Sequence, residues 1–217
     1  MVREAYHRDL HKLKSDVTGM GSLVSKAISD AVLSLKNRDA ELAQKVIDMD
    51  GEVDAVHYKI EDDCMRLLML QQPMARDLRL IIAVLKMNID LERMGDLALE
   101  IAVITKITAN VPPVKPLIDI PRMSEICQNM LTNTMNAFEN KDVEVAKKIA
   151  MRDDEVDALF DQIRRELISY MIEDPKKITG AQHLTFVARY LERIGDHITN
   201  LCENVVFMVT GERVELN

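Results

Sequence analysis

Asp90-Leu-Glu-Arg-Met-Gly-Asp96 occurs a second time, in altered form, as Tyr190-Leu-Glu-Arg-Ile-Gly-Asp196. Other segments repeat at nearly the same offset: residues 43–46 match 146–149, and residues 52–55 match 155–158. Self-similarity over about one hundred residues indicates a duplicated domain, because repeats of solenoid proteins are much shorter. The sequence therefore predicts one structural unit used twice.

The composition favours helices in both units. Apolar residues make up 47% of the 217 residues, whereas aromatic residues make up 4%, with no Trp. Glycine and proline number only 7 and 6. A chain poor in turn formers and aromatic residues, and rich in Leu, Met, Ala, Glu and Lys, is typical of an all-α protein.

Apolar spacing of three and four residues predicts six long helices, over residues 5–37, 40–71, 74–109, 122–139, 143–173 and 178–210. Asn37-Arg38-Asp39 separates the first two helices, with Asp39 as N-cap, and Asn140-Lys141-Asp142 repeats this punctuation. Four of the six prolines lie in residues 110–121, which predicts a linker. We expect an antiparallel three-helix bundle over residues 1–110, a linker over 111–121 and a second bundle over 122–217.

Acidic pairs four residues apart are the candidate site. Residues at this spacing lie on one helix face, where like charges repel by a few tenths of a kcal/mol. A bound cation would offset this repulsion, and oxygen donors select Mg, Ca, Mn or ferric iron. Neighbouring helices could unite two pairs, with room for more than one ion. The candidate metal ligands are Asp50, Asp54, Glu92, Asp96 and Glu100 in the first half, and Asp153, Asp157, Glu192, Asp196 and Asn200 in the second.

The apolar stripe of the last helix leaves Glu192 and Asp196 on its other side, so we expect the acidic clusters on an outer face of each bundle. The motif glycines, Gly95 and Gly195, cost about 1 kcal/mol each inside a helix, which suggests that another helix or a ligand approaches there. Two other interpretations stay open. The acids are a solvated surface of a purely structural protein, or the chain is a ferritin-like di-metal oxidase or ferroxidase.

Glu4-x-x-His7 has the spacing used in carboxylate-bridged di-iron bundles, but it occurs once. His57, His183 and His197 are interpreted as ordinary surface or boundary histidines. There is no Gly-rich phosphate loop, no GxSxG and no paired Cys–His arrangement, and thus no sign of a catalytic nucleophile.

Charge and cysteine usage bound the remaining possibilities. The net charge of −8 and the absence of a Lys/Arg run argue against nucleic acid as a partner. Cys64, Cys127 and Cys202 lie far apart and predict reduced thiols, in keeping with the cytoplasm. No apolar run approaches the ~20 residues of a spanning helix.

Together these segments resemble the PhoU family of bacterial and archaeal regulators over essentially the whole chain. The motifs that carry the resemblance are an E/D-x-x-x-D pair in each half, together with Gln72-Pro-Met-Ala-Arg-Asp-Leu-Arg79, Val209-Thr-Gly-Glu212 and His7-Arg-Asp-Leu-His-Lys-Leu13. Asn200 stands where the first half has Glu100, so the two clusters need not be equal.

The resemblance implies a non-enzymatic, metal-binding negative regulator of phosphate uptake and phosphate-starvation signalling. It implies multinuclear metal clusters at the acidic motifs, with iron as the first candidate and Mn, Mg or Zn as others. The implied partners are the ATPase subunit of the phosphate ABC transporter and a sensor histidine kinase. It further implies a cytoplasmic homodimer that reaches the membrane only through those partners.

Overall fold

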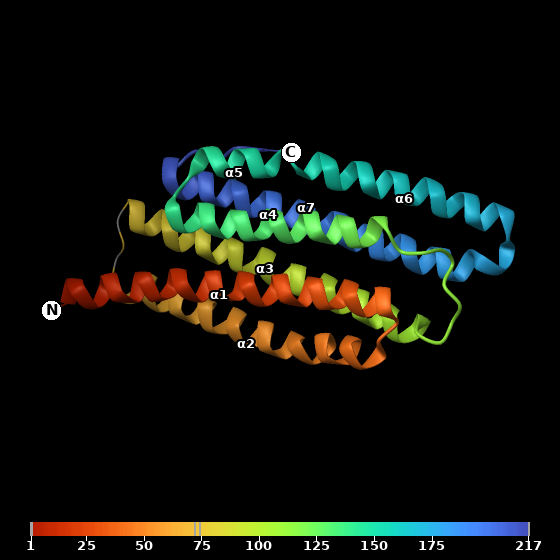
Figure 1. Ribbon diagram of the computed structural model, residues 1–217. Helices are drawn as coiled ribbons and strands as arrows, with labels where there is room; N and C mark the ends of the chain where they lie inside the picture. Colours follow the sequence, from red (N-terminus) through yellow and green to blue (C-terminus); the bar gives the residue numbers. More distant parts are fainter. Residues whose placement is uncertain (1, 72, 74, 217) are drawn as a thin grey trace.

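The computed structural model describes residues 2–71, 73 and 75–216, and within these ranges it contains helices and no strand (Figure 1). The first half consists of α1 (Val2–Asn37), α2 (Ala40–Gln71) and α3 (Arg76–Thr108). The second half consists of α4 (Asp119–Asn140), α5 (Val143–Ala150), α6 (Asp153–Glu173), the short 3₁₀ turn η1 (Pro175–Lys177) and α7 (Ile178–Thr210). The all-α prediction, with tandem three-helix bundles, is confirmed.

The predicted helices differ from the observed ones in two places. The predicted helix over 143–173 is wrong as a single element, because it breaks between α5 and α6 at Met151 and Arg152. The fourth helix begins at Asp119 rather than Arg122, so Pro121 lies in its first turn, where a proline costs no helical hydrogen bond. The predicted start of the third helix, Met74, lies outside the described residues.

The turn after the first helix of each half is built identically. Arg38 and Lys141 both adopt the left-handed conformation, each with a φ of 57°. An aspartate then caps the next helix: the Asp39 Oδ1 accepts from the backbone N–H of Leu42 at 2.9 Å, and the Asp142 Oδ1 accepts from Val145 at 3.0 Å. The predicted N-cap at Asp39 is confirmed, and its duplicate works in the same way.

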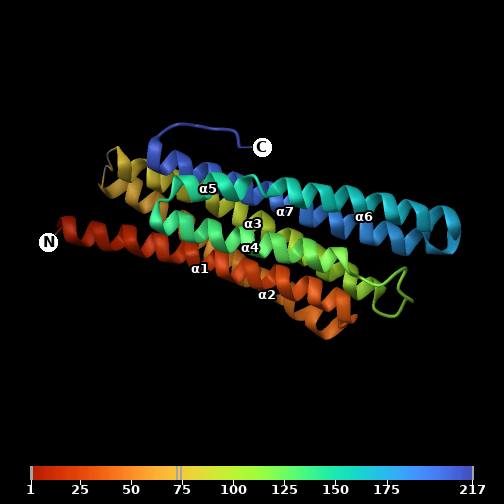
Figure 2. The ribbon, with the colours of Figure 1, turned by 45° about the horizontal axis from the view of Figure 1, so that its top comes forward.

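The two halves pack side by side through their first and last helices. In both views α3 and α7 run antiparallel through the middle of the molecule, and α1 lies along α4 (Figures 1 and 2). Helices α2 and α6 lie at opposite edges, each against the central helix of its own half (Figure 1). Buried apolar side chains from both halves form one continuous cluster. None of the described helices is long and apolar enough to cross a membrane.

The proline-rich segment after α3 lies against the start of α7. A Cβ atom built on Gly180 would lie 2.6 Å from Val114 Cγ2, so this helix turn has no room for a side chain. Lys115 is buried and forms ion pairs with Glu166 and, at 3.6 Å, with Asp119. The segment thus covers one end of the molecule rather than linking two separate bodies.

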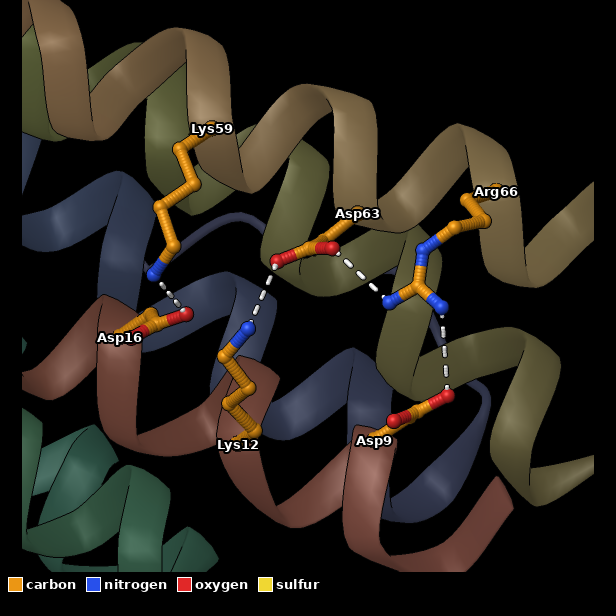
Figure 3. A network of polar contacts seen from close by, with 6 residues as sticks. All are labelled: Asp9, Lys12, Asp16, Lys59, Asp63 and Arg66. Carbon is orange, nitrogen blue, oxygen red and sulfur yellow. Dashed lines mark hydrogen bonds and ion pairs between the residues drawn. The ribbon is translucent and has the colours of Figure 1, made fainter. Parts of the chain in front are cut away.

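Ion pairs connect α1 and α2 along their solvent-facing seam (Figure 3). Lys59 Nζ lies 2.6 Å from Asp16 Oδ2. Asp63 contacts Arg66 at 2.9 Å and Lys12 at 3.9 Å, and Arg66 reaches Asp9 at 3.4 Å. Asp63 is therefore the one acid in this network that contacts cations of both helices.

Candidate functional site

Each acidic motif lies where the central helix of a half meets its neighbour. At Gly95 a Cβ atom would lie 3.2 Å from Val53 Cγ1, so α2 and α3 approach closely. Val53 lies between Asp50 and Asp54 in the sequence, and this contact therefore brings that pair beside Glu92 and Asp96. At Gly195 a Cβ atom would lie 2.3 Å from Asp153 Oδ1, on α6. The expectation that something approaches both glycines is confirmed, and it is a helix in each half.

The first acidic face consists of Asp50, Asp54, Glu92 and Asp96. Burial raises the pKa of Asp50, and the carboxylates of Asp54 and Asp96 raise it further. Burial is also the main cause of the raised pKa of Glu92, and the carboxylate of Asp96 is the second cause. Arg93 and His57 oppose this shift, and Asp54 adds to it. The four carboxylates thus lie close enough to repel one another across two helices, as their spacing predicts.

A cation already neutralises part of this face. Arg93 Nη1 donates to Asp96 Oδ2 at 3.0 Å, and its Nε lies 3.4 Å from Glu92 Oε2. His57 lies half-buried on α2, with Nδ1 3.4 Å from the Asn88 carbonyl oxygen. Sequence reasoning treated His57 as an ordinary histidine. The signal was its position, seven residues after Asp50 and three residues after Asp54, which places it on their side of the helix.

The second acidic face consists of Asp157, Glu192 and Asp196. Burial raises the pKa of Asp157, and Asp196 is the next cause, ahead of Asp154 and Asp161. Burial raises the pKa of Glu192 as well, followed by Asp196, with Arg189 opposing. The α6–α7 pair therefore presents the same kind of carboxylate cluster as the α2–α3 pair.

Glu192 is the most enclosed member of either face. Its side chain is 11% exposed and its Oε1 accepts a hydrogen bond from Arg189. Its Oε2 is buried and has no hydrogen-bond partner within the described chain. A buried carboxylate oxygen without a donor is costly, and a cation would satisfy it. Arg189 was not singled out from the sequence, although it lies one helical turn before Glu192.

Asp153 does not join the second acidic face, so the expected outer position is wrong for this residue. It is 1% exposed, and its Oδ2 accepts from the Thr199 hydroxyl at 3.4 Å. Its charge also contributes, after burial, to raising the pKa of the Cys127 thiol. The cause is the helix break: α6 begins at Asp153, whereas α2 continues unbroken through Asp50.

Asn200 contacts the opposite half, and Glu100 lies near that half. Asn200 Nδ2 donates to Asp90 Oδ1 at 3.1 Å, and His197 Nδ1 lies 2.9 Å from the same oxygen. Burial raises the pKa of Tyr190, and the carboxylate of Glu100 is the second cause. Asn200 and His197 thus belong to the contact between α3 and α7, and the charge of Glu100 acts across it.

In the part of the chain that the structure describes, no three His, Cys, Asp or Glu side chains are arranged to hold a metal ion. Arg93 and Arg189 instead pair with carboxylates of the two faces. The donor chemistry still suits a hard cation, and the unsatisfied Glu192 oxygen fits one. Metal ligation by the predicted residues remains a prediction.

Comparison with known proteins relates both halves to one family. The PhoU domain matches residues 17–105 and again residues 120–205. A phosphate-specific transport system accessory protein PhoU homolog from Aquifex aeolicus is 42% identical over 208 residues, covering 96% of this chain and 94% of the relative. The homolog from Caulobacter vibrioides is 39% identical over 212 residues, or 97% of this chain and 92% of the relative.

The crystal structure of PhoU from Pseudomonas aeruginosa has the same fold. It superposes with a TM-score of 0.92 at 35% sequence identity, covering 95% of this chain and all of the other. Agreement of this extent includes the relative placement of the two halves, and not only the bundle within each.

Proposed function

Because this chain belongs to the PhoU family, we propose that it is a regulatory accessory protein of phosphate-specific transport that lowers phosphate uptake and phosphate-starvation signalling. The observation that carries the proposal is similarity along the whole chain to relatives named as accessory proteins of that system. The absence of a nucleophile motif from the sequence supports an adaptor rather than an enzyme.

The two acidic faces are the proposed metal sites of this adaptor. Asp50, Asp54, Glu92 and Asp96 would hold metal in the first half, and Asp157, Glu192 and Asp196 in the second. A bound cation replaces Arg93 and Arg189 as the counter-charge and satisfies the open Glu192 oxygen. Iron is the first candidate, with Mn, Mg or Zn as others, since carboxylates suit hard ions.

Elemental analysis of purified protein tests the metal sites. We expect Glu92→Gln/Asp96→Asn and Glu192→Gln/Asp196→Asn to lose metal at one face each, and the combined variant to lose all of it. Glu41→Gln/Asp62→Asn is the matched control, because it removes equal charge from exposed positions of α2 that belong to neither face. Equal metal content in all variants would disprove the assignment.

The proposed partners are the ATPase subunit of the phosphate ABC transporter and the cytoplasmic part of a sensor histidine kinase, which place the adaptor at the cytoplasmic side of the membrane. Affinity capture from phosphate-replete cells with the tagged full-length chain tests this. We expect both proteins to be recovered, and a chain that recovers neither would contradict the proposal. Light scattering of the same preparation tests the proposed homodimer.

A further inference from the structure

One end of the molecule has a concentration of cations that the acidic faces do not use. Two adjoining hollows, of about 350 and 150 Å³, share Asp77, Leu80 and Lys141. They lie where the first turns of α1, the start of α3, the end of α4 and the end of α7 meet (Figure 1). We call this the basic cleft, and its charged or titratable lining residues are His7, His11, Lys14, Arg76, Asp77 and Lys141.

Cations gather here although the chain as a whole carries a net charge of −8. Lys14 and Lys141 form no ion pair with any carboxylate among the described residues, in contrast to Lys12, which pairs with Asp63 at 3.9 Å. Lys14 Nζ instead lies 5.8 Å from the centre of the Phe138 ring. Burial lowers the pKa of Lys14, and repulsion by Lys141 lowers it further, with Glu139 opposing. The two ammonium groups therefore lie close enough to repel each other, and neither is within ion-pair distance of a carboxylate among the described residues.

The start of α3 adds to the positive potential. Ala75 has no side chain that can cap the helix, and its φ is 45°. The 33-residue helix α3 therefore begins at the cleft, and its N-cap residue supplies no side-chain acceptor for the N–H groups of the first turn. Asp77 is the one carboxylate among the lining residues. Burial and this carboxylate raise the pKa of Tyr6 to about 12.

The duplicated end of the molecule shows what is special about the cleft. The hollow at that end has a volume of only about 60 Å³. It is lined by Arg38, Thr108 and Gly180, which correspond in the repeat to Lys141, Met208 and Leu80 of the basic cleft. There the proline-rich segment fills the space, and the Arg38 guanidinium donates to the Ala109 carbonyl oxygen at 2.6 Å. After α7 the chain turns back instead, and the Leu216 N–H donates to Glu203 Oε1 at 3.0 Å. The equivalent space at Lys141 stays open.

We infer that the basic cleft binds a tetrahedral oxyanion of the phosphate class, held between Lys14 and Lys141 with Arg76 and the start of α3. Such an anion would satisfy the two lysines that no carboxylate pairs with, and phosphate oxygens accept from ammonium, guanidinium and helix N-terminal donors. The volume is several times the ~30 Å³ that one water occupies. The inference does not rest on the proposed function, because no residue of either acidic face lines the cleft.

Isothermal titration calorimetry on the metal-free, full-length chain at constant ionic strength tests the inference, with inorganic phosphate in one arm and ATP in the other. Binding of phosphate identifies the free anion as the ligand, and binding of ATP alone identifies a phosphoryl group on a larger molecule. Sodium chloride should give no saturable heat. An absence of saturable heat with both phosphate and ATP would overturn the inference.

The variants separate binding from folding. We expect Lys14→Gln and Lys141→Gln to weaken anion binding by about tenfold or more each. Their melting temperatures without anion should not fall, because each substitution relieves the repulsion between the two lysines.

Asp77→Asn should strengthen anion binding, and Lys45→Gln, at the far end of α2, should leave it unchanged. Equal affinity in wild type, Lys14→Gln and Lys141→Gln would overturn the assignment even if an anion binds. Glu92→Gln/Asp96→Asn should bind phosphate normally, which separates this site from the metal sites.

Discussion

The two motif glycines look alike in the sequence but sit in different surroundings. A methyl group on Gly95 would meet Val53 Cγ1 at 3.2 Å, whereas on Gly195 it would lie 2.3 Å from the Asp153 carboxylate oxygen. The first neighbour is an apolar side chain that must shift by a few tenths of an ångström. The second is a charged group buried to 1% exposure, which has little space to move. The two positions should therefore respond differently to the same substitution.

We predict that Gly195→Ala lowers the free energy of unfolding by about 1–3 kcal/mol, as overpacking does in well-filled interiors. Gly95→Ala should change it by less, because the gain in helix propensity of about 1 kcal/mol offsets the tighter contact. Urea unfolding followed by circular dichroism at 222 nm measures both. Gly51→Ala is the matched control, since nothing lies within 4 Å of its Cβ position, and it should stabilise the protein. A Gly195→Ala variant as stable as wild type would show that Asp153 moves freely.

Glu192 gives a pH dependence whose sign follows from its surroundings. Burial and the carboxylates of Asp196 and Asp157 raise its pKa, despite Arg189 and Arg193. The folded chain therefore binds a proton here more tightly than the unfolded chain, whose glutamates titrate near pKa ~4.3. Stability from this group is present below that value and is lost as pH rises through the raised pKa.

We predict that the metal-free wild type loses stability relative to Glu192→Gln as the pH rises from about 4 to 7. Urea unfolding of both proteins in chelator at several pH values measures the difference. Added metal that binds the face should reverse the trend, because a cation favours the ionised carboxylate. A difference that does not change with pH would mean that Glu192 titrates as an exposed glutamate does.

At the scale of elements, the seam between α1 and α2 depends on Asp63, which contacts Arg66 and Lys12 (Figure 3). We predict that Asp63→Asn lowers the free energy of unfolding by about 0.5–1 kcal/mol. Each partly exposed ion pair contributes little, but this substitution weakens two of them at once. The loss should shrink in 1 M salt, where the Debye length is about 3 Å. Asp62→Asn, exposed and next in sequence, is the control and should be neutral. A loss independent of salt would indicate packing rather than charge.

The helix boundaries show how far sequence reasoning reached. Apolar spacing and the capping aspartates located most of the helices, because amphipathic periodicity and caps act locally. The break between α5 and α6 was missed for a physical reason: Ile149, Val156 and Ile163 keep the seven-residue spacing of Val46, Val53 and Ile60 across it. The available signal was Asp153, Asp154 and Glu155, three acids that suit the first turn of a new helix.

The candidate site was predicted in part. The spacing of Asp50, Asp54, Glu92 and Asp96 indicated a shared face, which their mutual effects on pKa support. Spacing alone could not show that Asp153 turns inward, because that depends on the break. Nor could it show that Asn200 pairs with Asp90, because two residues 110 positions apart meet only through the packing of α3 on α7.

At the scale of the molecule, the packing of the two halves was not evident from the duplication. Each half has its own helical bundle, yet α3 is buried around most of its circumference, with Leu91, Met94 and Ala98 all at 0% exposure. A helix that is apolar on several sides belongs in the middle of a larger assembly. The sequence carried this signal in the apolar residues that surround Glu92 on α3. It follows that the halves share one core and should unfold together.

We predict that Leu91→Ala, in the first half, destabilises both halves by the same amount. Removal of a fully buried leucine side chain costs about 2–5 kcal/mol, and in a single cooperative unit every amide that exchanges only by global unfolding feels the whole loss. Hydrogen exchange followed by mass spectrometry measures this through the slowest-exchanging amides of α4 and α7. Leu78→Ala, at 36% exposure on the same helix, is the control and should leave them protected. If Leu91→Ala weakened protection in α1, α2 and α3 alone, the halves would be separate units despite their common core.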